Sequence, residues 1–195
     1  RPLLVIYRAT LFPDPAATVS RWREASRRLG EAPPYLVAAE TFDVTSDFAR
    51  RAGFDATCEF PPHGSSGCRL PEARLPRFFA PFSGALLDYE RLAKFFLARR
   101  APALRRLKTV TLNWDNTARR KSSADAMVNF SLAAYHGWLS GAIGQSIQAA
   151  PPEERIVFTR TVKAVPPLYP DARWREMTAG RKLHELGPIS NICAD

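Results

Sequence analysis

Short apolar runs alternate along this chain with longer amphipathic segments, and this alternation restricts the possible folds more than any other feature. The apolar runs have the length and composition of buried β-strands and cover residues 3–7, 35–40, 54–60, 109–114 and 154–158. Helical patterns fall between them, at residues 16–29, 43–53, 88–99 and 121–149. Strands that alternate with helices form βαβ units, so we predict an α/β fold with about five parallel strands.

Proline and glycine mark the boundaries of these segments. Pro15 suits the start of the first helix, and Gly30 and Gly53 suit the ends of the first and second helices. Residues 61–86 are rich in Pro, Gly and Ser, and we predict that they form one long loop.

Length and composition favour one globular domain. The chain has 195 residues, of which 46% are hydrophobic and 24% charged. No apolar run reaches the roughly 20 residues of a membrane span, and no leader peptide is recognisable, so we predict a cytoplasmic protein without a membrane span. Because residue 3 already begins a strand, we also expect a further segment upstream of Arg1.

The net charge of +9 leaves two interpretations open. Such a charge is found in proteins that bind nucleic acids, and it is also found on solvated basic surfaces. Here the arginines are scattered through helical stretches, at 21–28 and 99–106, without an aromatic-interleaved basic strip. We therefore predict a solvated surface and no nucleic-acid partner.

The three cysteines, Cys58, Cys68 and Cys193, are an odd set with no metal-binding spacing. They are predicted to be thiols, as is usual in reducing compartments. His63 lies near Cys58 and Cys68 in the sequence and raises the alternative of a zinc site, but no CxxC or HxxxH pair supports it. We predict no metal and no cofactor.

Polar residues follow the predicted strands at their carboxyl ends. Arg8 follows the first strand, Glu40 ends the second, Glu59 lies near the end of the third, and Trp114–Asn116 lie at the end of the fourth. In parallel α/β folds, and above all in (β/α)8 barrels, ligands bind at this edge of the sheet. We therefore predict a ligand site there.

Glu40 and Glu59 are the candidate catalytic residues. If their strands are neighbours, about 4.8 Å apart, the two carboxylates would face one pocket, as acid/base or nucleophile pairs do in glycoside chemistry. Pro61 and Pro62 stiffen the chain after Glu59 and are expected to fix the directions of Glu59 and His63. In a transferase, Glu40 or Glu59 would act as a base or as a stabilising charge.

The candidate substrate-binding residues offer stacking surfaces and hydrogen-bonding groups. Trp114 offers a flat surface for a sugar ring, while the arginines are suited to the phosphates of a nucleotide sugar. The full set is Arg8, Phe60, His63, Trp114, Asp115, Asn116, Arg119 and Arg120. Structural roles remain the alternative, because an acid at a strand end can cap a helix and a Trp-Asp-Asn triplet can form an Asx turn.

Two motifs resemble those of a known family. GFDATCEFPPH (53–63) and NWDNTARR (113–120), together with LLVIYR (3–8) and ERIVF (154–158), are similar to the WbsX-like glycosyltransferases, a family related to the family 99 glycoside hydrolases. Trp22-Arg23, Asp88-Tyr89 and the stretch 135–139 add to the resemblance.

The resemblance implies a (β/α)8 TIM-type barrel and a role in building or trimming bacterial surface polysaccharide, such as O-antigen or lipopolysaccharide. It implies a glycan or nucleotide-sugar substrate. Residues 1–158 would form the C-terminal part of the barrel and residues 159–195 a divergent, partly helical tail. A partial barrel exposes a sheet edge, so we expect the chain to associate with itself or with a missing N-terminal half-barrel.

The chain also departs from the family pattern. The first strands of the family barrel have no counterpart, and segment 159–167 stands where the family carries an acidic motif. The related hydrolases have their two catalytic glutamates in that motif, and no residue here matches them. Three classes thus stay open: a glycan-active enzyme, a truncated and inactive carbohydrate-binding protein, and a nucleic-acid binder.

Overall fold

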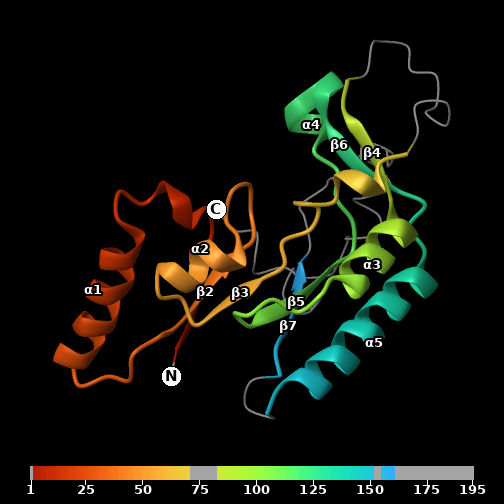
Figure 1. Cartoon of the computed structure of the whole chain (residues 1–195). Coiled ribbons are helices and arrows are strands. Elements are labelled where there is room, and N and C mark those ends of the chain that lie inside the picture. Colours follow the sequence, from red (N-terminus) through yellow and green to blue (C-terminus); the bar gives the residue numbers. More distant parts are fainter. Residues whose placement is uncertain (1, 71–82, 152–154, 161–195) are drawn as a thin grey trace, which may run out of the picture.

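The computed structural model describes residues 2–70, 83–151 and 155–160, and its main feature is a curled parallel sheet with helices (Figure 1). The strand order is β1-β2-β3-β5-β7, and every neighbouring pair is parallel. These strands are β1 (Leu3–Ile6), β2 (Tyr35–Ala39), β3 (Ala56–Cys58), β5 (Arg106–Thr111) and β7 (Val157–Arg160). The sheet is half of a barrel, which confirms the predicted α/β, partial TIM-type fold.

Helices connect the strands and begin where short polar side chains cap them. The α-helices are α1 (Pro15–Arg28), α2 (Ser46–Arg51), α3 (Tyr89–Ala98), α4 (Thr117–Arg120) and α5 (Leu132–Ala149). The capping side chains are Asp14 for α1, Thr45 for α2, Asp88 for α3 and Ser131 for α5, and each accepts a hydrogen bond from the backbone N–H three residues later. Single 3-10 turns, η1 (Ala9–Leu11), η2 (Ser66–Cys68) and η4 (Lys121–Ser123), lie in the connections.

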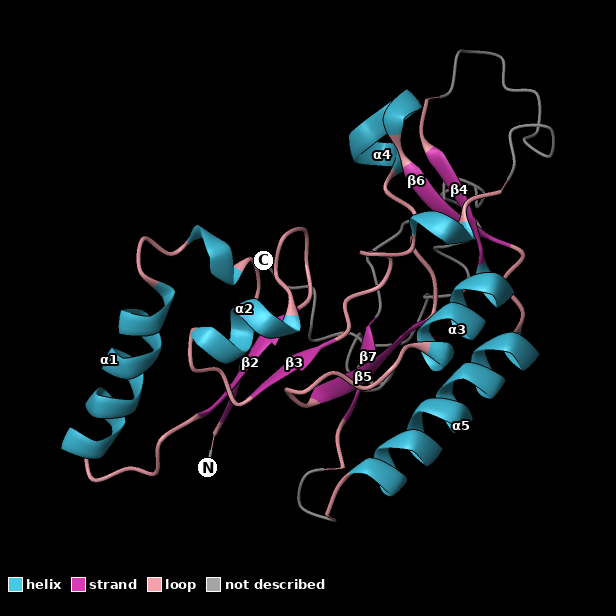
Figure 2. Cartoon of the chain, viewed as in Figure 1, coloured by secondary structure: helices cyan, strands magenta, loops and turns pink. Residues whose placement is uncertain are grey.

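A second, two-stranded parallel sheet lies beyond the carboxyl ends of the main strands, near α4 (Figure 2). It pairs β4 (Ala85–Asp88), from the connection after β3, with β6 (Asp125–Val128), from the connection after β5. Two predictions were wrong here: residues 85–86 were assigned to a loop, and residues 125–128 to a helix. Each strand has only four residues, and its partner lies about 40 positions away in the sequence, so no local pattern marks either one.

The predicted position of β5 was three residues too far toward the carboxyl terminus. The strand begins at Arg106, whereas the apolar run TVTLNW placed it at 109–114. Arg106 and Lys108 point toward buried carboxylates rather than toward solvent, so these polar residues occupy positions of a buried strand. The last strand was also displaced, since β7 spans Val157–Arg160 rather than 154–158.

The main sheet has apolar clusters on both faces. On the helix-covered face, Ile6, Leu36 and Ala38 pack with residues of α1 and α2. Val110 packs there with Phe96 of α3 and Trp138 of α5, whose rings stack with centroids 5.7 Å apart. A third apolar cluster lies on the opposite, inner face, and its described residues come from the strands and from positions next to them. They are Val37, Ala39, Ala56, Cys58 and Leu107, with Leu3, Tyr35, Phe60, Ile156 and Phe158 packed around them.

The remaining predictions concern the membrane, the cysteines and the tail. No helix in the described part of the chain is long and apolar enough to cross a membrane. Cys58 and Cys68 are both buried thiols and belong to different apolar clusters, while Cys193 and the predicted tail helix lie outside the described residues.

The edge of β1 generates a prediction about association. Among the described strands β1 has one neighbour, and the side chains of Leu4 and Val5 are 45% and 43% exposed. Unpaired strand edges with apolar side chains favour pairing with other chains. We expect the average mass measured by light scattering to rise with protein concentration, and Val5→Lys to suppress that rise.

Leu29→Lys is the matched control, because Leu29 is an exposed leucine at the end of α1 and is not part of the strand β1. A wild-type protein that stays monomeric at all concentrations, with a sharp thermal transition, would show that the edge does not drive self-association.

Candidate functional site at the carboxyl ends of the strands

Aromatic and cationic side chains gather where β1, β2 and β3 end. Tyr7 and Phe60 have ring centroids 5.3 Å apart, and His63 lies 5.7 Å from Phe60 and 4.6 Å from Phe42. The guanidinium of Arg8 stands over the Phe42 ring, 4.7 Å from its centroid. We call these five residues, Tyr7, Arg8, Phe42, Phe60 and His63, the rim cluster.

The backbone at the rim is arranged to present these side chains. Arg8 and Phe42 both adopt left-handed conformations, with φ of 54° and 49°. Non-glycine residues rarely adopt this conformation, and such residues are concentrated at functional sites. The rim cluster includes the predicted residues Arg8, Phe60 and His63.

Tyr7 and Phe42 were not predicted. Both are aromatic residues within two positions of a predicted strand end, and that position was the signal that could have identified them. Their side chains are 52% and 64% exposed, so they offer more accessible aromatic surface than Phe60 does.

Glu40 lies at the centre of a network of buried ion pairs. One of its carboxylate oxygens accepts hydrogen bonds from the Thr57 hydroxyl at 2.9 Å and from Nε of Arg106 at 2.8 Å. The other accepts a hydrogen bond from Arg99 at 2.7 Å. Two guanidinium groups thus neutralise this carboxylate.

Glu59 belongs to the same network and is only 1% exposed. Lys108 lies 3.2 Å from its Oε1, Arg99 lies 3.7 Å from the same oxygen, and the N–H of Thr109 donates to Oε2 at 3.4 Å. Burial raises the pKa of the Glu59 carboxyl, although Lys108, Thr109 and Arg99 all act in the opposite direction.

The two carboxylates are neighbours, as the prediction required, because β2 pairs directly with β3. They lie on the helix-covered face: Thr57, which binds Glu40, is opposite Ala38 of the helix-side cluster, and Lys108 also donates to the carbonyl of Phe96 in α3. Phe60 packs on the inner face instead. The structure therefore separates the paired carboxylates from the Phe60 ring by the thickness of the sheet.

The segment Trp114–Arg120 is placed by the small sheet. The backbone N–H of Met127 donates to the carbonyl of Trp114, and the indole packs against the cluster around Trp138. The Asp115 carboxylate accepts from the N–H of Thr117, and the Asn116 side chain accepts from the N–H of Asp125. The Asp115 bond is an Asx turn, as the structural alternative predicted, whereas the Asn116 bond joins the segment to the start of β6. A ligand role for the two side chains stays a prediction.

Arg119 and Arg120 project from the short helix α4 as exposed side chains. Helix α4 follows β5 in the chain and lies beside β6 of the small sheet (Figure 1). The predicted role of the two arginines in binding phosphate stays a prediction.

Comparisons with known proteins agree with the architecture. A family model described as glycosyltransferase WbsX matches residues 1–162. The chain is also similar to the protein WxcX from two strains of Xanthomonas campestris pv. campestris, with 33% and 32% identity over 203 residues. Each alignment covers all of this chain but only 28% of the relative. No solved structure matches.

The raised pKa of Glu59 predicts a pH-dependent stability. The folded protein holds the Glu59 proton more tightly than the unfolded chain does, where the pKa is near 4.5. The stability that this group contributes is therefore fully present below pH 4.5 and is lost as the pH rises through the folded pKa. We expect the free energy of unfolding of the wild type, minus that of Glu59→Gln, to fall as the pH rises above 4.5.

Urea denaturation of both proteins across pH 4 to 8 measures this difference. Glu31→Gln, at an exposed glutamate, is the control and should show a much smaller trend. If the difference in free energy of unfolding between the wild type and Glu59→Gln stays constant or grows as the pH rises, the pKa of Glu59 is not raised in the folded protein.

Proposed function

Because this chain belongs to the glycosyltransferase WbsX family, we propose that it is a carbohydrate-active part of a protein that builds bacterial surface polysaccharide, O-antigen or lipopolysaccharide. The chain spans 28% of the length of its WxcX relatives, and the proposal is made for the activity to which this part contributes. A cytoplasmic location and a glycan or nucleotide-sugar substrate belong to the same proposal.

The rim cluster is the observation that carries the proposal. Aromatic rings bind the C–H faces of sugar rings, and neighbouring polar side chains orient the hydroxyl groups. Tyr7 and Phe42 supply exposed rings, while Arg8 and His63 supply hydrogen-bonding groups within the same cluster. The cluster lies at the carboxyl ends of parallel strands, where α/β folds bind their ligands.

We assign Glu59 or Glu40 as base or stabilising charge in the proposed transfer. The raised pKa of Glu59 supports this role, because a carboxyl group that titrates nearer to neutral pH is a better general base. In the same proposal Arg8, Arg119 and Arg120 contact the phosphates of a nucleotide-sugar donor, and Trp114, Asp115 and Asn116 contact the sugar.

A non-catalytic carbohydrate-binding protein is the second candidate. The observation in its favour is the position of Glu59, which is buried on the helix-covered face with its oxygens occupied by Lys108 and Thr109. In this case the rim cluster would bind a glycan, and the ion network would only stabilise the sheet.

Nucleic-acid binding has less support from the structure. On α1, Arg27 and Arg28 both pair with Glu24, and on α2 Arg50 and Arg51 both pair with Asp47. These pairs offset half of the positive charge of the four arginines, which favours a solvated surface over one that binds a phosphate backbone.

Glycan binding at the rim is tested with Phe42→Leu. The substitution removes the ring but keeps an apolar side chain, so we expect affinity for oligosaccharides from bacterial O-polysaccharide to fall roughly 3- to 10-fold. Calorimetric titration measures the change, with Leu132→Ala at an exposed leucine of α5 as the control. Equal affinities for wild type and Phe42→Leu would show that the glycan does not bind at the rim cluster.

Turnover is tested with Glu59→Gln, using release of the nucleoside diphosphate from a panel of nucleotide sugars. If Glu59 acts as a base, turnover should fall about 100-fold or more while glycan affinity is retained. Glu31→Gln controls for the loss of one carboxylate elsewhere. Absence of turnover in the wild type, with glycan binding intact, would favour the non-catalytic candidate.

A further inference from the structure

A small cavity of about 190 Å³ lies between the loop that follows β3 and the small sheet. Its walls come from the loop between Pro62 and Arg69, from the β4 residues Ala85 and Leu87, and from Asp125 in β6. Pro62 and Gly64, which both line it, are the sequence neighbours of His63 in the rim cluster. Because consecutive Cα atoms are about 3.8 Å apart, the cavity begins within one residue of the rim cluster.

Three polar side chains in these walls make no hydrogen bond or ion pair to any described residue: Ser66, Arg69 and Asp125. The printed bonds of the last two involve only their backbone. Arg91 donates to the carbonyl of Arg69, and the N–H of Asp125 donates to the side chain of Asn116. Ser66 and Arg69 are exposed and Asp125 is half-buried, so solvent and small ligands can reach all three.

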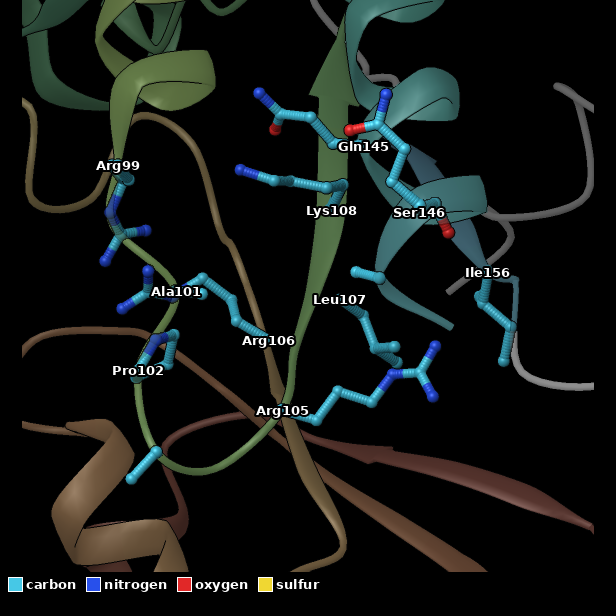
Figure 3. Close-up of a pocket in the computed structure, with 13 residues that line it drawn as sticks. Arg99, Ala101, Pro102, Arg105, Arg106, Leu107, Lys108, Gln145, Ser146 and Ile156 are labelled. Atoms are coloured by element: carbon cyan, nitrogen blue, oxygen red, sulfur yellow. The ribbon is translucent and has the colours of Figure 1, made fainter. Parts of the chain in front are cut away.

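A larger cavity of about 570 Å³, beside the first half of β5, differs in this respect (Figure 3). Arg99, Arg106 and Lys108 line it, and each of them pairs with Glu40 or Glu59. These cations belong to the ion network and are already engaged in holding the sheet together. The small cavity is therefore the better candidate for a ligand, since its polar side chains are not needed for such a network.

The loop wall of the small cavity is held in place before any ligand binds. The Arg91 guanidinium, from α3, donates to the carbonyls of Gly67 and Arg69 at 3.2 and 3.4 Å. The N–H of Leu70 donates to the carbonyl of Leu86 at 2.7 Å, which joins the end of the loop to β4. Because the wall is already ordered, a ligand that binds there has less conformational entropy to overcome.

The polar groups of this cavity suit hydroxyl groups better than anions. A sugar hydroxyl both donates and accepts hydrogen bonds, so it can donate to the Asp125 carboxylate and accept from Arg69 or Ser66. A phosphate or carboxylate group offers only acceptors at neutral pH, and Asp125 would repel it. Pro62 and Leu87 supply apolar surface for C–H groups. The volume is below the roughly 300 Å³ of most small-molecule pockets, which limits the occupant to about one sugar ring.

We propose that this cavity is a subsite for one uncharged sugar ring of the glycan, next to the ring that contacts the rim cluster. Asp125 accepts hydrogen bonds from the hydroxyl groups of this ring, and Arg69 and Ser66 donate to its oxygens. The subsite rests on the proposed function for the path of the glycan, which passes from the rim cluster to the cavity beside His63.

The test is an NMR titration of the purified protein, with assigned backbone amides, using the methyl glycosides of glucose, galactose and mannose. We expect at least one of them to shift the amide signals of Gly64, Ser66 and Asp125 saturably. A dissociation constant on the order of 1–10 mM is expected for so small a ligand. Inorganic phosphate should leave these signals unchanged.

Asp125→Asn and Arg69→Gln should each weaken this binding about tenfold, since a hydrogen bond to a charged group contributes about that factor. The matched controls are Glu31→Gln and Arg21→Gln, at exposed residues that do not line the cavity, and they should have no effect. Ser66→Phe fills the cavity without a change of charge and should abolish binding. Circular dichroism confirms that each variant is folded.

Two NMR outcomes would overturn the subsite. One is the absence of saturable shifts at the cavity with all three glycosides, including the case in which only the amides of rim residues such as Arg8 and Phe42 shift. The other is an equal loss in Arg69→Gln and Arg21→Gln, or shifts caused by phosphate in place of the sugars.

Oligosaccharides from bacterial O-polysaccharide separate failure of the subsite from failure of the proposed function. If one glycan occupies both places, calorimetry should show a loss of affinity in Phe42→Leu and also in Asp125→Asn. A loss in Phe42→Leu alone would overturn the subsite and leave the rim site standing. A loss in Asp125→Asn alone would support a sugar in the cavity and contradict glycan binding at the rim cluster.

Discussion

The structure depends most on the buried ion network that joins the sheet to α3. Glu40 and Glu59 come from adjacent connections after β2 and β3, Arg106 and Lys108 come from β5, and Arg99 follows α3. Buried charges are tolerated only when they are paired and hydrogen-bonded, and removal of one partner typically costs about 3–5 kcal/mol. The network therefore ties together three strands and one helix that are distant in the sequence.

The network also adjoins both the rim cluster and a cavity, because the end of β3 pairs with the start of β5. At the carboxyl end of β3, Phe60 and His63 follow Glu59 in the sequence. Phe60 contacts Tyr7, and His63 contacts Phe42, in the rim cluster. Arg8 lies over the Phe42 ring. At the amino-terminal end of β5, the cations that hold the carboxylates also line an open cavity. The same side chains thus stabilise the sheet and line this cavity.

Sequence patterns predicted the elements whose boundaries are local. Strands β1 and β2 lie between prolines, glycines and polar residues, and α1 begins at Pro15 as the helix-start signal indicated. The neighbouring positions of Glu40 and Glu59 were also foreseen, because polar residues at the ends of consecutive strands meet when the strands pair. The partners of these acids were not foreseen, since Arg99 is 59 residues from Glu40 and Lys108 is 49 residues from Glu59 in the sequence.

By itself, the sequence determined the alternation of strands and helices, the family, and the polar residues that follow the strands, because each depends on neighbours along the chain. Only the tertiary structure decided that β4 and β6 form a second sheet, that the two carboxylates lie on the helix-covered face, and that aromatic residues after different strands gather at one rim. The reason is physical. Pairing register and the face on which a side chain lies depend on contacts between distant segments, and a shift of one residue reverses the face.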